Sequence, residues 1–371
     1  FLSMRKAGFV LFVMLAITLL FLVVTVLLQG GPASIFSNPF RWFGEIDTDL
    51  ALDIVSTAAE LLAAVLAIAI TVVAIIVELA ANRYSHRISS LFVREPINVV
   101  VMGFLVVATL YSVWAAFILD AGAGEPIISN AGLIAVLVFL TLSLAILLPY
   151  FAFVLSFLSP VSVIGRLQGA AMAAIRNIGK KSIASSQEEF ITAVDELQDI
   201  ARRSAELGDR AVEMACIDAM FDLVLSYQPL IAALEKDAPD WFDVNGVVRN
   251  DPDFVSVNES SLATIRSERT WAEVKILRQY LDLVGDSRPG SRDASYLIAI
   301  NTRRMAIGGL EHRPDLELTN LCMRCFNSFL RATINKKDAR TGYYIMNHYR
   351  MLAEELLAKH EPDAAKNVAD Y

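Results

Sequence analysis

The sequence predicts an all-α integral membrane protein, with a transmembrane domain of four helices over residues 1–160 and a cytoplasmic α-helical bundle over residues 161–371. The first observation is composition: 55% of the 371 residues are hydrophobic and 19% are charged, whereas a typical soluble domain is about 25% charged. The second is the distribution of charge: Asp, Glu, Lys and Arg number 15 in residues 1–160 and 57 in residues 161–371. The third is that apolar residues of the second part recur at helical spacing and show no run of strand-like alternation.

Four apolar stretches of the first part are long enough to cross a bilayer, which takes about 20 residues of helix. They cover approximately residues 9–28, 55–79, 97–119 and 131–158. Each is expected to be a helix, because a single span can satisfy its backbone polar groups in lipid only internally. Pro149 lies inside the last stretch and is expected to kink it, because its ring nitrogen cannot donate a hydrogen bond to the carbonyl of Ala145.

The first stretch has two interpretations. Arg5 and Lys6 precede it and small residues follow it from Gly30 to Ser34, as in a secretory signal peptide. Its apolar part is longer than the roughly 7–15 residues of a signal sequence. We therefore expect it to be a retained membrane anchor.

The orientation of the spans follows from the placement of Lys and Arg, which favour the cytoplasmic side. One side of the predicted topology holds nine basic residues: Arg5, Lys6, Arg83, Arg87, Arg94, Arg166, Arg176, Lys180 and Lys181. The other side has one base, Arg41, against five acids: Glu45, Asp47, Asp49, Asp120 and Glu125. We expect both termini to lie in the cytoplasm and two short acidic loops to face outside.

Helices of the second part are expected over approximately residues 186–201, 209–235, 262–284, 293–308, 315–334 and 340–359, with a loop rich in Asp, Pro, Gly and Asn over 237–258. Ser186 and Glu189 have the spacing of a capping box at the start of the first helix. Short connections favour an antiparallel bundle. A helical-repeat array is the alternative, although no fixed period supports it.

No catalytic constellation stands out in the sequence. Cys322 and Cys325 have C-x-x-C spacing, but a structural zinc site takes four ligands and only His312 and His348 are candidates for the others. We interpret the two cysteines as small core residues that stay reduced in a cytoplasmic body. We expect no metal, no cofactor and no enzymatic activity. A net charge of −8 and an isoelectric point near 5.2 argue against nucleic acid as a partner.

Basic residues gather beside the spans. The stretch from Asn177 to Ser182 resembles the end of a phosphate-binding loop, but Ala174 stands where that pattern needs its first glycine. Anionic lipid headgroups explain the basic residues better, because they attract Lys and Arg next to a membrane span. The headgroup candidates are Arg83, Arg87, Arg94, Arg176, Lys180 and Lys181.

The second span carries a stripe of small and polar residues. No Gly or Pro lies between Glu45 and Glu95, so one helix is expected from about Leu50 to Phe92. Along it a small or polar residue recurs every three or four positions, which places all of them on one helix face. The pore-lining candidates, called the polar stripe below, are Asp53, Ser56, Glu60, Ala63, Ala67, Thr71, Ala74 and Glu78, and the same spacing continues to Ala81 and Ser85.

The polar stripe has two interpretations. In the first, Ala63, Ala67 and Thr71 form a seam of small residues at which two helices approach closely, and the two glutamates mark the membrane borders. In the second, several subunits set the stripe around a common axis. Glu60 and Glu78 then form acidic rings at the mouths of a narrow pore, and such rings favour cations.

The stretch around the end of the second span resembles a known family. Residues 78–87 read ELAANRYSHR, and Phe92, Arg94-Glu95, Gly103 and Tyr111 follow. This pattern resembles the bacterial family of membrane proteins called domain of unknown function 2254, over roughly residues 50–160. His86 and Glu95 stand where the family usually has Pro and Asp, and its paired histidines after the fourth span are missing around 153–159. The resemblance implies four inner-membrane spans and a cytoplasmic helical region, and it implies no established activity.

Two functions of different class fit these features. One is a homo-oligomeric, cation-permeable channel, lined by the second span and assembled or gated by the cytoplasmic bundle. The alternative is a membrane-anchored scaffold or accessory subunit that recruits a cytoplasmic protein partner and transports nothing. A lipid-modifying enzyme is disfavoured, because the sequence shows no nucleophile or metal set. The lipid bilayer is a partner in every case.

Overall fold

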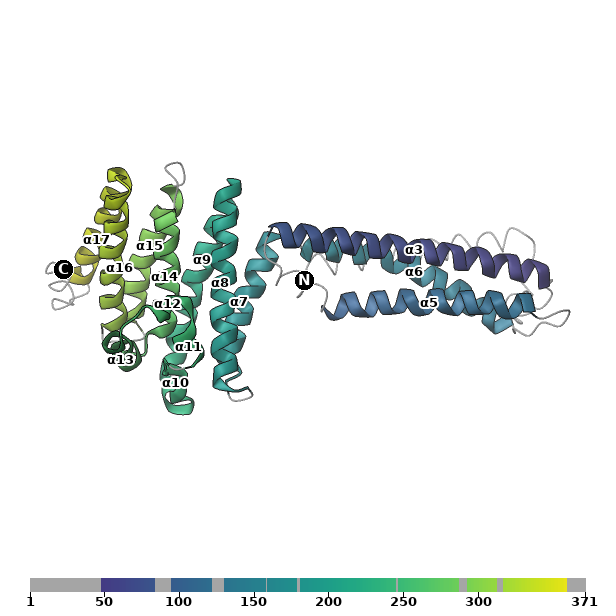
Figure 1. Ribbon diagram of the computed structural model, residues 1–371, viewed down its shortest axis with the longest axis horizontal. Coiled ribbons are helices and arrows are strands. Elements are labelled where there is room, and N and C mark those ends of the chain that lie inside the picture. The colour runs from purple at the N-terminus through teal and green to yellow at the C-terminus, as the bar shows by residue number, and fades with distance from the viewer. Residues whose placement is uncertain are drawn as a thin grey trace. The chain divides into compact units, whose positions relative to one another are not determined.

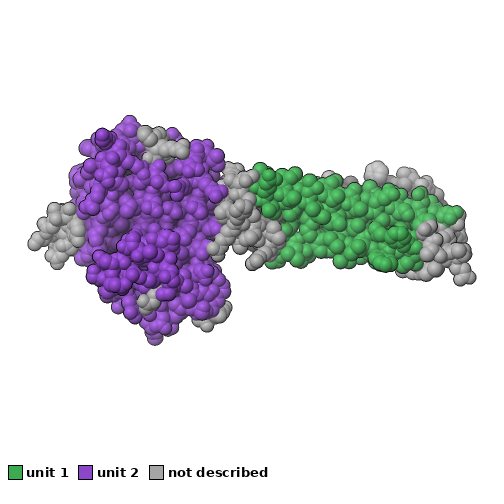
Figure 2. Space-filling view, in the orientation of Figure 1, with its two compact units in different colours: residues 1–82, 86–159 green, residues 83–85, 160–371 purple. Residues whose placement is uncertain are grey.

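The computed structural model describes residues 48–83, 95–121, 130–157, 159–178, 181–244, 246–286, 292–311 and 316–358. The regular secondary structure of these residues is helix without a strand, which confirms the all-α fold class. The chain divides into two compact units, one of residues 1–82 and 86–159 and the other of residues 83–85 and 160–371 (Figure 2). They are called the apolar unit and the helical body here.

Three long helices make up the described part of the apolar unit: α3 (Thr48–Arg83), α5 (Pro96–Ala121) and α6 (Asn130–Phe157) (Figure 1). Each is long and apolar enough to cross a membrane. They coincide with the spans predicted at 55–79, 97–119 and 131–158, and α6 continues as helix through Pro149. The span predicted at 9–28 lies outside the described residues.

Helix α3 is longer than a membrane crossing requires. Its 36 residues extend about 54 Å at 1.5 Å per residue, whereas the hydrocarbon core is about 30 Å thick. Its continuity follows from the absence of Gly and Pro, the two residues that most weaken a helix interior. The continuation predicted from Tyr84 to Phe92 lies outside the described residues.

Side chains of all three helices form a core at one end of the apolar unit. It consists of Val55 and Ala58 of α3, Ala115 and Leu119 of α5, and Leu133 and Val136 of α6. Two buried hydroxyls of α5 bond to their own helix, since Thr109 and Ser112 donate to the carbonyls of Leu105 and Ala108. Such local bonds satisfy polar side chains without help from water.

One hydrogen bond joins α5 and α6 directly. The hydroxyl of Tyr150 donates to Oδ1 of Asn98 at 2.5 Å, and both side chains are buried. An interhelical hydrogen bond of this kind holds apolar helices together where the hydrophobic effect between them is weak.

The helical body consists of stacked helices. They are α7 (Pro160–Arg176), α8 (Ile183–Leu207), α9 (Arg210–Tyr227), α14 (Trp271–Asp286), α15 (Arg292–Gly309), α16 (Glu317–Asn335) and α17 (Ala339–Ala358). Helices α8, α14 and α16 pack in sequence as one layer, and α7, α9, α15 and α17 form the other (Figure 1). The antiparallel bundle expected from the short connections is therefore built as two layers, in the manner of a helical-repeat array.

A segment of short helices interrupts this stack between α9 and α14. It contains η2 (Gln228–Leu230), α10 (Ile231–Asp237), η3 (Pro239–Phe242), α11 (Val247–Asn250), α12 (Pro252–Val255) and α13 (Glu259–Ser267). We call residues 228–270 the inserted segment. Its Trp241 packs against Trp271 of α14, with ring centroids 4.9 Å apart and the ring planes tilted by 58°, and the Trp271 indole donates to the Trp241 carbonyl at 2.8 Å. Gln187 of α8 donates to the carbonyls of Trp241 and Asp243, both at 3.1 Å.

Three sequence expectations for the helical body are wrong in detail. The helix expected over 262–284 is two helices, because the chain turns at Arg269, whose φ is +57°. The loop expected over 237–258 contains the short helices named above. The helix that follows the predicted capping box begins earlier, since Ser182 is its N-cap and accepts from the amide of Ser185 at 3.2 Å, while Ser186 is buried inside α8.

The stretch Arg210–Asp237 also meets the length and composition of a membrane span. Its apolar residues are buried inside the helical body: Cys216, Ile217, Met220 and Val224 of α9 are at most 1% exposed. Helix α9 packs against α7, α8 and α15. Its hydropathy is thus accounted for by the core of the helical body.

Candidate functional site

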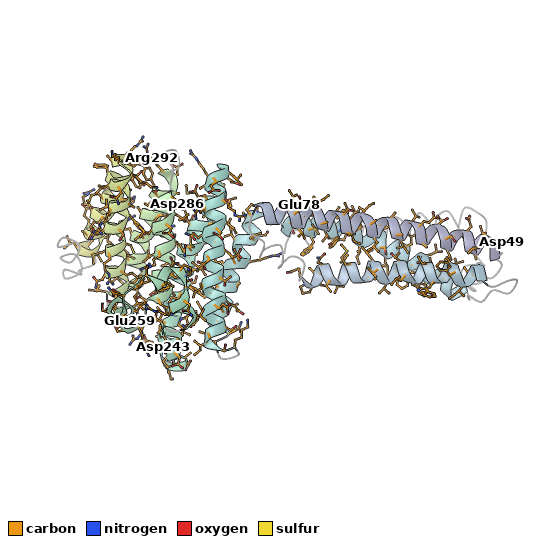
Figure 3. The ribbon with its side chains drawn as sticks, viewed as in Figure 1. Asp49, Glu78, Asp243, Glu259, Asp286 and Arg292 are labelled. Atoms are coloured by element: carbon orange, nitrogen blue, oxygen red, sulfur yellow. The ribbon has the colours of Figure 1, made fainter. Side chains whose placement is uncertain are left out.

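The polar stripe lies on the exposed side of α3. Ser56 is half-buried, and the other seven members, from Asp53 to Glu78, are exposed in the described part of the chain. Figure 3 labels Glu78 towards one end of the helix and Asp49, just before the stripe, at the other. Ala81 and Ser85, which extend the spacing, have side chains outside the described residues. The carboxylates of Glu60 and Glu78 are therefore uncovered by α5 and α6.

The packed face of α3 is a different set of residues. Val55, Ala58, Leu62, Val65, Ala69 and Ile76 are buried. At 3.6 residues per turn these positions fall roughly opposite the polar stripe. Within the described residues, the small residues Ala63, Ala67 and Thr71 are therefore not the seam between α3 and its neighbours. Thr71 donates its hydroxyl to the carbonyl of Ala67 at 2.8 Å.

The headgroup candidates fall largely outside the described residues. This holds for Arg87, Arg94, Lys180 and the side chain of Arg83. Arg176 is exposed in the last turn of α7. Lys181 forms an exposed ion pair with Glu189 at 2.5 Å, so its charge is already partly matched by the protein.

The two cysteines of the C-x-x-C pair differ in environment. Cys322 is fully buried and Cys325 is half-buried. Burial raises the pKa of the Cys325 thiol to about 12, although Arg324 and Arg278 act in the opposite direction. His348 is buried elsewhere beside Tyr344, and His312 lies outside the described residues. Neither thiol belongs to a metal-ligating group among the residues that the structure describes.

A buried charged cluster was missed by the sequence reasoning. Lys275 of α14 is 1% exposed, and its Nζ lies 2.9 Å from Asp251, 2.6 Å from Asp253 and 2.6 Å from Asp195. Asp251 and Asp253 come from the inserted segment, and Asp195 comes from α8. The amide of Gln279, one turn along α14, donates to Asp253 at 2.6 Å and to Asp195 at 3.2 Å. The lysine therefore ties three parts of the helical body together.

Burial and the neighbouring charges shift the pKa values of Lys275 and Asp195 for different reasons. Burial would by itself lower the pKa of Lys275, but the three carboxylates outweigh it and the pKa is raised, so the ammonium stays charged. Burial raises the pKa of Asp195 to about 6, against the attraction of Lys275. Asp195 is the most exposed of the three carboxylates at 42%.

The three carboxylates are close enough to hold a metal ion, since an oxygen of each lies within 4.8 Å of the others. The Lys275 ammonium lies within 3 Å of all three residues. It already supplies the positive charge that a cation would bring. We therefore interpret the cluster as a structural ion-pair network.

Apolar side chains dominate the outer surfaces of the long helices. Val100 and Phe117 of α5, and Leu148 and Leu155 of α6, are 60–68% exposed. Contiguous exposed apolar surface of this kind marks a membrane-facing protein. Three such helices define a membrane protein with several apolar spans.

The chain belongs to the family described as "Predicted membrane protein (DUF2254)", whose model matches residues 5–211, more than half of the chain. The resemblance seen over roughly residues 50–160 is confirmed and extends further at both ends. The match includes α7 and α8 and ends at the start of α9, before the inserted segment. No curated protein and no solved structure matches the chain.

Proposed function

We propose that this protein is a homo-oligomeric channel in which the polar stripes of several α3 helices surround a hydrated axis that cations cross. The observation that supports it is the exposure of the stripe on the side of α3 away from its packed face. A second copy of the chain can cover this face with the same residues. Small side chains such as Ala63 and Ala67 allow the close helix approach that a narrow pore needs.

The charge of Glu60 favours a hydrated surrounding. Glu60 lies inside the apolar stretch Asp49–Leu79, which is long enough to span a membrane, and its side chain is exposed. Even near the edge of the hydrocarbon core, a carboxylate that faces lipid is less favourable than one that faces water. Water along a central axis removes that cost, because it solvates the charge.

The spacing of the two glutamates fits the two mouths of a pore. Glu60 and Glu78 are 18 positions apart, about 27 Å along a helix, which is close to the thickness of the hydrocarbon core. Rings of carboxylates at both ends concentrate cations and repel anions. The proposal places the chain in a bacterial inner membrane with both termini in the cytoplasm, and it assigns the helical body an assembly or gating role. It includes no enzymatic activity.

The test combines mass and flux on one sample. The full chain in nanodiscs is expected to have the mass of several copies and, in liposomes, to pass K⁺ in preference to Cl⁻. Glu60→Gln and Glu78→Gln are expected to lower the K⁺ to Cl⁻ selectivity without lowering the yield of oligomer. The matched control is Asp199→Asn, which removes an exposed charge from α8 of the helical body. Unchanged selectivity in both glutamate variants contradicts the acidic rings.

Cross-linking tells whether the polar stripe is covered by a neighbouring copy or by the chain's own first span. Ala67→Cys is expected to form a disulfide between two copies under mild oxidation. If Ala67→Cys instead pairs only with a cysteine placed at Ala16, the stripe is a seam covered by the span predicted at 9–28. That result overturns the channel.

A membrane-anchored scaffold is the second candidate. The observation that favours it is the last described helix, α17, which exposes Tyr343, Met346 and Leu357 at 80%, 50% and 58%. Stacked helical layers commonly present binding surfaces for other proteins. A monomer or dimer without K⁺ flux supports this candidate, and the triple variant of these residues to Ser is then expected to lose its cytoplasmic partner.

A further inference from the structure

A groove in the helical body is lined by no residue of the polar stripe or of the Lys275 cluster. It has a volume of about 480 Å³ and is bordered by the inserted segment, α14 and α16. Its walls are partly apolar, with Val257, Ile265, Leu277, Leu281 and Leu321, and partly polar. Sites for small organic ligands have this size and this mixture, typically about 300–1,000 Å³.

The polar side of the groove carries two arginines. Arg324 of α16 pairs with Glu268 at 3.1 Å. Arg278 of α14 is half-buried and makes no salt bridge with any residue that the structure describes. Both side chains border the groove. Among the residues that border the groove, the two arginines outnumber the one acid, Glu268, and their guanidinium groups match the oxygens of a phosphate. Arg278 also attracts Asp282, one turn along α14.

A second polar group in the groove lacks a partner. Thr270 immediately precedes α14, is 0% exposed and borders the groove. Its Oγ1 has no hydrogen bond within the described part of the protein. A buried hydroxyl without a partner is unfavourable, because it has lost its bonds to water and gained none in the protein. The cost is recovered if a ligand in the groove supplies the missing bond.

The two features are set at a distance that a single ligand can span. Thr270, just before α14, and Arg278 within it are eight positions apart, about 12 Å at the rise of a helix. We propose that the groove binds a small organic phosphate, with the phosphate at Arg278 and Arg324, an apolar or aromatic body against the leucine wall, and a polar atom at the Thr270 hydroxyl. This site does not depend on ion conduction by the apolar unit.

The phosphate can come from a soluble ester or from the headgroup of an anionic lipid. The test uses the full chain in nanodiscs of phosphatidylcholine, with AMP, phenyl phosphate and inorganic phosphate as soluble probes, and a second set of nanodiscs that contain phosphatidic acid. Alkylation of Cys325 by N-ethylmaleimide at pH 8.5 is followed by mass spectrometry, because this thiol borders the groove while Cys216 and Cys322 are fully buried. Either AMP or phosphatidic acid is expected to slow the alkylation at least fivefold, and which one does so identifies the source.

Substitutions in the groove test whether the ligand that slows alkylation of Cys325 is bound there. Arg278→Gln is expected to lower the affinity for the protecting ligand at least tenfold. Arg278→Lys is expected to keep part of that affinity, because it keeps the charge. Arg331→Gln is the matched control, since Arg331 is exposed on α16 and does not border the groove. Thr270→Val is expected to raise the stability of the unliganded protein, because it removes the unpartnered hydroxyl, while the ligand binds more weakly. The proposal is overturned if none of the probes slows alkylation, or if Arg278→Gln binds as tightly as the Arg331→Gln control.

Discussion

The ammonium of Lys275 lies 2.9 Å and 3.0 Å from the two carboxylate oxygens of Asp251, and the two side chains are 1% and 3% exposed. Asp251 is also the N-cap of α12, because its side chain accepts a hydrogen bond from the amide of Asp253 at 2.9 Å. The contact therefore fixes both the fold of the inserted segment and its attachment to α14.

Removing the lysine charge is expected to destabilise the helical body strongly. Lys275→Met leaves three carboxylates together without their cation, and breaking a buried pair in this way costs about 3–5 kcal/mol. Arg350→Met is the control, because Arg350 forms an exposed pair with Glu354 one turn away, which is worth about 0.5 kcal/mol or less. Urea unfolding of the full chain, followed by tryptophan fluorescence, measures both. Equal effects of the two substitutions contradict the structural role of Lys275.

The same cluster is expected to make stability depend on pH. The pKa of Asp195 rises from 3.8 in the unfolded chain to about 6 in the fold, because burial disfavours its charge. The folded state thus binds the proton more tightly, so this contribution to stability is complete below about pH 4 and is lost as the pH rises through 6. Asp195→Asn is expected to remove this part of the pH dependence of the unfolding free energy. Asp199→Asn, at an exposed residue of the same helix, is expected to keep it. Unfolding free energies measured from pH 4 to 7 decide the matter.

The hydrogen bond between Tyr150 and Asn98 is expected to stabilise the apolar unit. Tyr150→Phe removes the donor and keeps the ring, so the expected loss is about 0.6–2 kcal/mol. Tyr111→Phe is the matched control, since Tyr111 is exposed and contacts Phe139 through its ring. Unfolding in mixed micelles with increasing dodecyl sulfate measures the difference. If both variants lose the same stability, the bond contributes nothing measurable.

The junction of α15 and α16 is expected to tolerate only glycine at position 309. A Cβ there would lie 2.7 Å from Cδ2 and 3.3 Å from Cγ of Leu318, which is buried. Gly309→Ala forces that side chain to move and is expected to cost about 1–3 kcal/mol. Gly169→Ala in α7 meets nothing within 4 Å and is expected to stabilise its helix by about 0.5–1 kcal/mol. Melting temperatures that move in the same direction would falsify this account.

The membrane-capable helices could be predicted because an uninterrupted apolar run of about 20 residues is long enough to cross a bilayer and rare in soluble domains. Helix ends in the body could also be predicted where Gly or Pro lies, as at Gly308 and Gly309. The break between α13 and α14 could not, because Arg269 makes the turn with neither residue. The start of α8 was misplaced because Ser182 and Ser186 are equally good caps, and only packing selects between them.

The site was less predictable than the fold. The polar stripe could be read from one helix, because its members are neighbours on a single face. The partners of Lys275 lie 22, 24 and 80 positions away in the chain, so no local sequence pattern predicts these contacts. The groove depends in the same way on residues of the inserted segment, α14 and α16, which only the folded chain brings together.

The position of the inserted segment also has a consequence for folding kinetics. Helices α7, α8 and α9 meet through short connections, as do α15, α16 and α17, so each group can form rapidly from local contacts. The packing of α14 on α8 must wait until the ends of a long intervening loop have met, which carries an entropic cost. We expect a refolding phase that is limited by this closure. The fluorescence of Trp241, inside the inserted segment, and of Trp271, at the start of α14, is positioned to follow it.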